Sequence, residues 1–289
     1  MSHQFSQVGV LGAGTMGNGI AQVCAMAGLK VVLIDINESA VRRGIETLEG
    51  SLSRLVKKEK MSQADGVAAL ARVTGSIDHG ALAGADAVIE AATENLALKL
   101  RILKQIEDVV DADALIASNT SSISITQLAA ALASPTRFVG MHFFNPVPMM
   151  SLVEVIGGLQ TSQETLDRTL GLANAIGKSP ILVKNAAGFA VNRILIPMIN
   201  EAVFVLQEGL ASAEDIDKSM VLGCNQPIGP LALADLIGLD TVLAIMQVLN
   251  EGFSDPKYRP APLLKELVAA GRLGRKSGHG FHIYADGQQ

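Results

Sequence analysis

A glycine-rich turn between two apolar segments constrains the fold of this chain more than any other feature. Gly12, Gly14 and Gly17 form a G-x-G-x-x-G pattern. Apolar residues 8–11 precede it, and a second apolar segment follows at residues 30–34. This order predicts a strand, a tight turn, a helix and a second strand parallel to the first. In that arrangement Gly12 permits the turn, Gly14 lets the backbone approach a pyrophosphate, and Gly17 lets helix and strand pack closely.

Asp35 indicates which ligand such a turn would hold. It ends the second apolar segment, where a carboxylate can accept hydrogen bonds from the ribose hydroxyls of a dinucleotide. The same carboxylate would repel a ribose 2′-phosphate, and Ile36 and Asn37 offer no arginine to receive one. The sequence therefore predicts an NAD site in preference to an NADP site. The alternative, a glycine-rich turn without a cofactor, leaves the flanking strands and the acid unexplained.

Apolar segments and helical patterns alternate through the first 184 residues. This alternation predicts an α/β fold, namely a Rossmann-type, doubly wound, mainly parallel sheet covered by helices on both faces. We expect its strands at residues 8–11, 30–34, 72–76, 87–90, 115–117, 138–142, 152–156 and 181–184.

The character of the chain changes near residue 188, where strand signals stop and long apolar patterns at helical spacing begin. Ser212 followed by Asp215 is typical of a helix N-cap. The pattern predicts an NAD-binding domain at 1–184 and an all-α domain at 185–289. Helices this apolar must bury a broad face, so we expect a homodimer through the C-terminal domain. The expected helices span residues 189–208, 212–222, 230–250 and 262–270.

Composition excludes several other classes of protein. The net charge of −5 over 289 residues argues against a general nucleic-acid binder. Neither a secretory signal nor an uncharged apolar run of membrane-spanning length is present, so we expect a cytoplasmic protein. Cys24 and Cys224 lie far apart without metal-ligand spacing, which indicates buried, reduced thiols and no metal site.

Two polar segments follow expected strands, at the edge where ligands bind in an open parallel sheet. Residues 118–122 are Ser, Asn, Thr, Ser and Ser. They are placed to touch a nicotinamide and a substrate, but an ordinary loop in which Ser121, Ser122 or Ser124 caps a helix explains them equally well. The chain has five histidines, and only His142 lies at the end of an expected sheet strand. His142 is therefore the candidate general base.

Hydride transfer from an alcohol needs such a base, because the hydroxyl proton must leave as the hydride does. A carboxylate that fixes the imidazole tautomer and stabilises its charged form improves the base. Glu154 lies inside an apolar strand, and a turn over residues 145–150 would return that strand beside His142. The alternative places Glu154 on a solvent-facing edge. Asn192 could hydrogen-bond a substrate carbonyl, or equally cap a helix or bridge the domains.

The glycine turn belongs to a set of distinctive segments spread over nearly the whole chain. The others are residues 94–99, 118–122, 142–146, 152–155, 188–193 and 274–281. Together, and in this order, the segments resemble the L-3-hydroxyacyl-CoA dehydrogenase family. In length the chain is most similar to the single-function bacterial 3-hydroxybutyryl-CoA dehydrogenases.

The resemblance implies roles for individual residues. His142 would be the catalytic base, Glu154 its orienting carboxylate, and Ser121 and Asn192 would contact the reacting oxygen and the thioester region. Ser51, Lys58 and Ser121 fall where the family contacts coenzyme A. The basic cluster, defined as Arg54, Lys57, Lys58 and Lys60, reads from its pattern as a solvated helix face; the resemblance makes it a clamp for CoA phosphates. The implied cofactor-binding residues are Gly12, Gly14, Thr15, Met16, Gly17, Asp35, Glu94, Lys99, Ser121, Asn145 and Lys276.

The resemblance also implies an activity: the interconversion of (S)-3-hydroxyacyl-CoA and 3-oxoacyl-CoA with NAD. The expected substrates are short-chain, with 3-hydroxybutyryl-CoA and acetoacetyl-CoA as the pair, in fatty-acid metabolism. Two alternatives stay open, a dehydrogenase of a free hydroxy or sugar acid and a catalytically silent NAD-binding structural protein. The basic cluster argues against the first, and the presence of His142, Glu154, Ser121 and Asn192 against the second.

Overall fold

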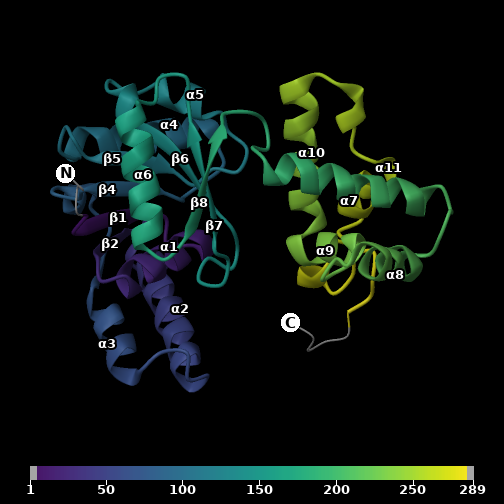
Figure 1. Ribbon diagram of the computed structural model, residues 1–289, viewed down its shortest axis with the longest axis horizontal. Coiled ribbons are helices and arrows are strands. Elements are labelled where there is room, and N and C mark those ends of the chain that lie inside the picture. The colour runs from purple at the N-terminus through teal and green to yellow at the C-terminus, as the bar shows by residue number, and fades with distance from the viewer. Residues whose placement is uncertain (1–4, 285–289) are drawn as a thin grey trace. The chain divides into compact units, whose positions relative to one another are not determined.

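The computed structural model describes residues 5–284, and the chain divides into two compact units, Met1–Asn185 and Ala186–Gln289 (Figure 1). The first unit contains a sheet of eight strands in the order β3-β2-β1-β4-β5-β6-β7-β8. Neighbouring strands pair in parallel except β6 and β7, so β7 and β8 run opposite to the other six. The strands are β1 (Gln7–Leu11), β2 (Lys30–Ile34), β3 (Val73–Ser76), β4 (Ala87–Glu90), β5 (Leu115–Ser118), β6 (Phe138–Phe143), β7 (Leu152–Gly157) and β8 (Ser179–Lys184).

Helices surround this sheet, which confirms the predicted α/β class (Figure 1). The central strands are buried on both faces and read as unbroken apolar runs, as a covered parallel sheet requires. Val8, Val10, Leu33 and Ile89 are fully buried, and Ile20 of α1 packs into the same core. The helices of this unit are α1 (Thr15–Met26), α2 (Glu38–Lys57), α3 (Gln63–Ala71), α4 (Leu96–Val109), α5 (Ile125–Ala129) and α6 (Gln163–Ala175), with short 3₁₀ turns η1 (His79–Leu82) and η2 (Pro135–Arg137).

The amino end of β1 is fixed by a single carboxylate. Asp86 lies just before β4, and its Oδ2 accepts hydrogen bonds from the backbone N–H of Ser6 (2.6 Å), the Ser6 hydroxyl (2.8 Å) and the backbone N–H of Gln7 (2.9 Å). Burial opposes ionisation of Asp86, but the bonds from Gln7 and Ser6 outweigh it and lower the pKa of the carboxyl group. The start of β1, an interior strand of the sheet, therefore depends on one charged side chain.

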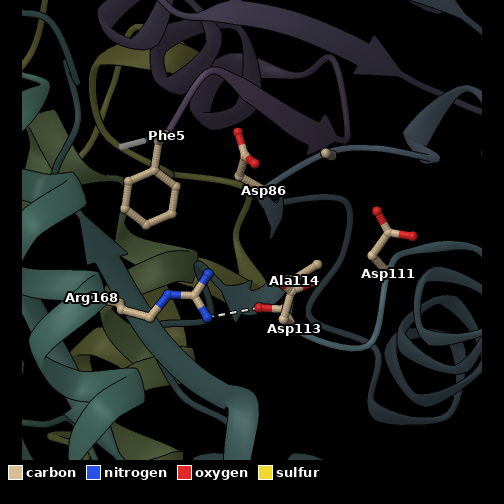
Figure 2. Close-up of a pocket in the computed structure, with 7 residues that line it drawn as sticks. Phe5, Asp86, Asp111, Asp113, Ala114 and Arg168 are labelled. Atoms are coloured by element: carbon tan, nitrogen blue, oxygen red, sulfur yellow. Dashed lines mark hydrogen bonds between the residues drawn. The ribbon is translucent and has the colours of Figure 1, made fainter. Parts of the chain in front are cut away.

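A small cavity of about 130 Å³ lies beside this carboxylate. Figure 2 shows Phe5, Asp86, Asp111 and Asp113 around it, with Arg168 donating a hydrogen bond to the backbone oxygen of Asp113 (2.7 Å). These residues precede β1, β4 and β5 or come from α6. The cavity therefore lies at the amino edge of the sheet, opposite the edge where cofactors bind in such folds.

The second unit is helical in its described part. It contains α7 (Val191–Gln207), α8 (Ala213–Cys224), α9 (Pro230–Ile237), α10 (Leu239–Phe253) and α11 (Pro262–Ala269), with 3₁₀ turns η3 (Pro256–Tyr258) and η4 (Arg275–Ser277). The Ser212 side chain accepts a hydrogen bond from the Asp215 N–H (3.1 Å), which confirms the predicted cap of α8. Ile199, Val203, Leu231, Val242 and Met246 are among the buried residues of its own core.

Two expectations about this unit are wrong. A single helix over residues 230–250 is replaced by α9 and α10, which meet at an angle of 98°. Gly238 lies between them with φ of 100°, a conformation that other residues rarely adopt, and the apolar spacing on both sides concealed the break. Cys224 is exposed, not buried, because it is the last residue of α8, where residues 222–225 are all exposed.

No single helix among residues 5–284 is long and apolar enough to cross a membrane, although the bent pair α9–α10 passes that test by length and composition.

Candidate active site

The glycine turn has the geometry that its pattern predicts. Gly12 has φ of 104°, and a Cβ there would lie 2.6 Å from the Ala91 backbone oxygen. A Cβ on Gly17 would lie 1.6 Å from the Gly12 oxygen, so the packing of α1 on β1 excludes any side chain at both positions. A Cβ on Gly14 would meet nothing within 4 Å. The small size of Gly14 therefore serves no contact within the protein, which fits a surface that a pyrophosphate approaches.

The N-terminus of α1 differs from those of the other helices in this unit. It begins after Gly14 without a side-chain cap, whereas each of α2 to α6 begins with one. Its first backbone N–H groups lack a side-chain acceptor, and they carry the positive end of the helix dipole. This is the arrangement that binds phosphate groups. The residues that cap the other helices are Asn37, Ser62, Asn95, Ser124 and Ser162.

Asp35 joins the glycine turn to the end of β2. Its Oδ2 accepts a hydrogen bond from the Ala13 N–H and its Oδ1 from the Ile36 N–H, both at 2.7 Å. Each carboxylate oxygen has a second lone pair, so Asp35 keeps acceptor capacity for ribose hydroxyls.

A cavity of about 510 Å³ opens beside Asp35, within the range that suits a small ligand. Its walls include three exposed apolar side chains that sequence reasoning missed, Ile36, Ile77 and Leu98. The sequence did contain a sign of these exposed side chains. Ile36 lies two residues after the end of β2, and Ile77 directly follows β3, where an apolar side chain has no core to enter. Polar groups in the same walls also went unrecognised, namely His79, Arg101 and Gln105. Arg101 thus lines the same cavity as Asp35, although Ile36 and Asn37, the residues that follow Asp35, include no arginine.

A buried ion pair supports the part of the site that contains Glu94 and Ser121. The Lys99 ammonium on α4 binds Glu90 at the end of β4, and it also donates to the Ser118 hydroxyl (3.2 Å). Ser118 in turn donates to Glu90 Oε2 (2.7 Å). Lys99 is 1% exposed, so it lies below the surface of the site, not open within it. A buried ammonium needs such a carboxylate, and Glu90 is a site residue that sequence reasoning did not single out.

Glu94 and Ser121 lie together above this pair. Glu94 Oε1 accepts hydrogen bonds from the Ser121 N–H (2.8 Å) and hydroxyl (3.2 Å), and Oε2 accepts one from Thr120 (2.8 Å). Ser124 caps α5. Of the three serines that could cap this helix, Ser124 does so, and Ser121 bonds to Glu94 instead.

His142 and Glu154 occupy directly opposed positions in the antiparallel pair of β6 and β7. The His142 Nδ1 lies 2.7 Å from the Glu154 Oε2, and their side chains are 7% and 0% exposed. The alternative in which Glu154 lies on a solvent-facing edge is wrong, because β7 lies between β6 and β8. The Phe144 ring tilts against the imidazole at a centroid distance of 4.6 Å.

The segment after β6 is tied to segment 118–122. The Asn119 side chain accepts a hydrogen bond from the Phe143 N–H (2.9 Å), and the exposed Asn145 lies two residues further along the chain. The first unit thus brings the glycine turn, Asp35, Glu94, Ser121, His142 and Glu154 to the carboxyl ends of β1, β2, β4, β5 and β6.

The remaining expected residues lie elsewhere. Ser51 and Lys58 lie seven positions apart at the C-terminal end of α2, on one helix face. The basic cluster on this end makes no ion pair with an acidic residue in the described part of the chain. Asn192 and Lys276 belong to the second unit. Asn192 is buried in the first turn of α7, and Lys276 donates to both carboxylate oxygens of Asp240 at 2.6 Å.

Comparison with known proteins identifies the family. Residues 7–186 match the model of the 3-hydroxyacyl-CoA dehydrogenase NAD binding domain, and residues 188–284 match that of the C-terminal domain. The chain is 48% identical over 284 residues to a 3-hydroxybutyryl-CoA dehydrogenase of Bradyrhizobium diazoefficiens, which covers 98% of this chain and 97% of that protein. It is 50% identical over 276 residues to a probable 3-hydroxybutyryl-CoA dehydrogenase of Deinococcus radiodurans, with 96% and 99% covered.

Solved structures agree with this assignment. The crystal structure of (S)-3-hydroxybutyryl-CoA dehydrogenase from Ralstonia eutropha superimposes with a TM-score of 0.96 at 60% identity, covering 98% of this chain and all of that one. The matched NAD binding domain confirms the cofactor that Gly12, Gly14, Gly17 and Asp35 predict. The chain belongs to the 3-hydroxyacyl-CoA dehydrogenase family and is an NAD-dependent oxidoreductase acting on a CH–OH group.

Proposed function

We propose that this enzyme interconverts (S)-3-hydroxybutyryl-CoA and acetoacetyl-CoA, with His142 and Glu154 as its acid–base pair. The observation that carries the proposal is the buried contact of 2.7 Å between the His142 Nδ1 and the Glu154 Oε2, at the edge of the sheet that holds the glycine turn.

The roles in the reaction follow from this contact. NAD, when bound, accepts the hydride that leaves the substrate carbon. His142 takes the hydroxyl proton at Nε2 in oxidation and returns it in the reverse direction. Glu154 holds the imidazole in the tautomer that carries a proton on Nδ1, and it stabilises the imidazolium that forms. Burial of both groups strengthens their interaction, since water does not screen it.

Ser121 and Asn192 would contact the substrate. Glu94 holds the Ser121 backbone and hydroxyl, so the serine enters the reaction in a fixed position. Asn192 is placed by the first turn of α7, and its amide would bind the reacting oxygen or the thioester carbonyl. Glu94, Asn145 and Lys276 are proposed to lie along the bound NAD, with the buried Lys99 supporting this part of the site from below.

The basic cluster on α2 would bind the phosphates of coenzyme A, together with Ser51. Lys58→Glu should raise KM for acetoacetyl-CoA about tenfold and leave KM for NADH nearly unchanged, because a repelling charge replaces an attractive one. Steady-state kinetics would measure this, with an acetoacetyl-pantetheine substrate as the control that lacks the nucleotide phosphates. Unchanged kinetics with acetoacetyl-CoA would show instead that the basic cluster is only a solvated helix face.

The second unit has exposed apolar side chains that a second copy of the chain would cover. Ile194, Leu210, Leu222 and Leu236 are 73%, 76%, 73% and 53% exposed. We therefore propose a homodimer through this unit.

One assay tests the proposed reaction against its alternatives. NADH absorbance is followed with acetoacetyl-CoA and then with free acetoacetate. Oxidation of NADH by acetoacetyl-CoA alone supports the proposal. Equal turnover of free acetoacetate would favour a dehydrogenase of free acids. NADH binding without turnover of either compound would indicate a silent NAD-binding protein.

A further inference from the structure

Lys178 is a buried lysine for which the proposed reaction has no role. It is 8% exposed and lies between the end of α6 and the start of β8. Gly177, with φ of 75°, ends the helix, and the Lys178 N–H closes that turn on the Ala173 oxygen (2.9 Å). The position of the Lys178 backbone is therefore fixed by the helix end.

The Lys178 ammonium binds the segment that joins β6 to β7, residues 144–151. Its Nζ donates to the backbone oxygens of Val147 (2.5 Å) and Met150 (2.8 Å). The adjacent Ser179 N–H donates to the Ser151 oxygen (2.8 Å). Three hydrogen bonds from two consecutive residues thus hold this segment.

The same segment is held from a second direction by α1. Val147 is 2% exposed, and a Cβ on Gly19 would lie 2.8 Å from the Val147 Cβ. The missing side chain of Gly19 therefore makes room for Val147. Segment 144–151 lies between an apolar contact and a buried ammonium, so removal of the ammonium would release one side of it.

This segment decides where reacting groups lie. It connects His142 on β6 to Glu154 on β7, which are opposed in the antiparallel register, and it carries Asn145. A shift of the segment would move Asn145 directly and would strain the register that places the carboxylate on the imidazole.

The charge of Lys178 is costly for a purely structural contact. Burial lowers the pKa of Lys178, and the nearest ionisable group that affects it is the Cys24 thiol. Burial raises the pKa of the Cys24 thiol to about 12, so the thiol is neutral and supplies no counter-charge. Lys178 makes no ion pair with a carboxylate within residues 5–284. An unpaired buried ammonium is expensive, whereas an apolar side chain of similar length would fill the same space without that penalty.

We propose that Lys178 is a positioning residue of the dehydrogenase reaction. Its ammonium fixes segment 144–151 so that Asn145 and the pair of His142 and Glu154 keep the geometry that hydride transfer needs. The inference rests on the proposed roles of those three residues.

The test compares three variants by kinetics with acetoacetyl-CoA and NADH. Lys178→Met keeps the length of the side chain but removes the donors, and it should lower kcat/KM for NADH by about 10- to 100-fold, the loss expected when reacting groups are misplaced. Its melting temperature should stay well above the assay temperature, because relief of the buried charge offsets the lost hydrogen bonds. Lys178→Arg should recover most of the activity. Lys184→Met, at an exposed lysine on the same β8 strand, is the matched control and should behave as wild type.

Two further measurements separate positioning from general stability. In an Asn145→Ala background, Lys178→Met should cost much less than it does in wild type, because both changes remove the same alignment. Hydrogen exchange should rise in peptides that cover residues 144–151 and stay unchanged in α6 and β8. If Lys178→Met is too unstable to assay, Lys178→Gln, a neutral donor of shorter reach, takes its place in both comparisons.

A folded Lys178→Met protein with wild-type kinetics would overturn the inference while leaving the proposed dehydrogenase reaction intact. A loss that is fully additive with Asn145→Ala, with faster exchange spread over α6 and β8, would also overturn it and make Lys178 a residue of overall stability. Absence of turnover in the wild-type enzyme itself would instead reject the proposed function.

Discussion

At the scale of single residues, the proposed chemistry depends on a contact between two side chains that the sheet places opposite each other. His142 and Glu154 are buried, and their opposition is set by the backbone register of β6 and β7. The side chains need no flexible loop to meet. The imidazole orientation is therefore fixed before a substrate arrives, which favours catalysis by a preorganised group.

The first prediction concerns this pair. His142→Ala should lower kcat by about 10²- to 10⁴-fold, the usual contribution of a positioned acid–base group, with little change in NADH affinity. Glu154→Gln should also lower kcat, because an amide cannot stabilise the imidazolium. The double variant should be little worse than His142→Ala alone, since the residues act as a unit. Stopped-flow and steady-state kinetics would measure these rates.

Two results would contradict this prediction in different ways. Near-wild-type turnover of a folded His142→Ala protein would remove His142 as the base. Fully additive losses would leave His142 in its role but make Glu154 a structural residue of β7.

The second prediction concerns cofactor choice at Asp35. Asp35→Asn keeps an acceptor for the turn but removes the charge, so it should weaken NADH binding about tenfold and narrow the preference over NADPH. Arg101 lines the same cavity and would then attract the 2′-phosphate. Arg101→Gln in the Asp35→Asn background should therefore weaken NADPH and leave NADH unchanged. Fluorescence titration with NADH and NADPH would measure both affinities. If Arg101→Gln changes the two affinities equally, Arg101 has no role in the recognition of the 2′-phosphate.

At the scale of elements, the start of β1 is held to β4 by Asp86. Because the pKa of this carboxyl is lower in the folded chain, its ionisation stabilises the fold above its unfolded pKa of about 4, and this contribution is lost as pH falls through the folded pKa. Asp86→Asn should lower the melting temperature at pH 7 by about 2–4 °C, as expected for roughly 1 kcal/mol. Thermal unfolding of both proteins at pH 7 and about pH 3 would show the difference shrink at the lower pH. A constant difference would show that the charge of Asp86 is not what matters.

The elements of the first unit could be predicted from sequence because they repeat one physical pattern. Strands buried on both faces read as short apolar runs, and each expected run corresponds to a strand of the sheet. The break between α9 and α10 was missed because helical spacing continues across Gly238, and only that residue marks the bend. Period alone cannot distinguish one long helix from two that share an apolar face.

The side chains of the candidate site also fall into two groups, those that a local sequence pattern indicates and those that it does not. His142, Glu154, Ser121 and Asp35 were singled out as candidates because polar residues at strand ends, or inside apolar strands, are conspicuous in a sequence. Arg101 and Lys178 were not, because their positions depend on distant partners, a cavity wall and two backbone oxygens. Glu90 also ends an expected strand, so the same signal was present, but its pairing with Lys99 on α4 could not be read from the sequence. No local pattern records such pairings.

At the scale of the whole molecule, the two units differ in how they use apolar surface. Both units expose apolar side chains, but Ile36 and Ile77 of the sheet unit line the cavity beside Asp35. In the helical unit, Ile194, Leu210 and Leu222 are exposed on the surface that a second copy of the chain would cover. Leu222→Arg on α8 should convert the expected dimer to monomer, because an arginine in an apolar interface would be buried without a partner. Sedimentation equilibrium would measure this, with circular dichroism to show that the fold is retained. An unchanged mass for a folded variant would exclude this face as the interface.

The apolar walls of the cavity beside Asp35 have a thermodynamic consequence. Ile36 is 89% and Ile77 is 51% exposed, so water covers hydrocarbon there until a nucleotide enters. Displacement of that water should give NADH binding a negative heat-capacity change. The binding enthalpy should therefore become more favourable on warming while the entropy becomes less so, and the affinity should change little over the physiological range. The exposed isoleucines would thus make the affinity of the enzyme for NADH nearly independent of temperature over this range.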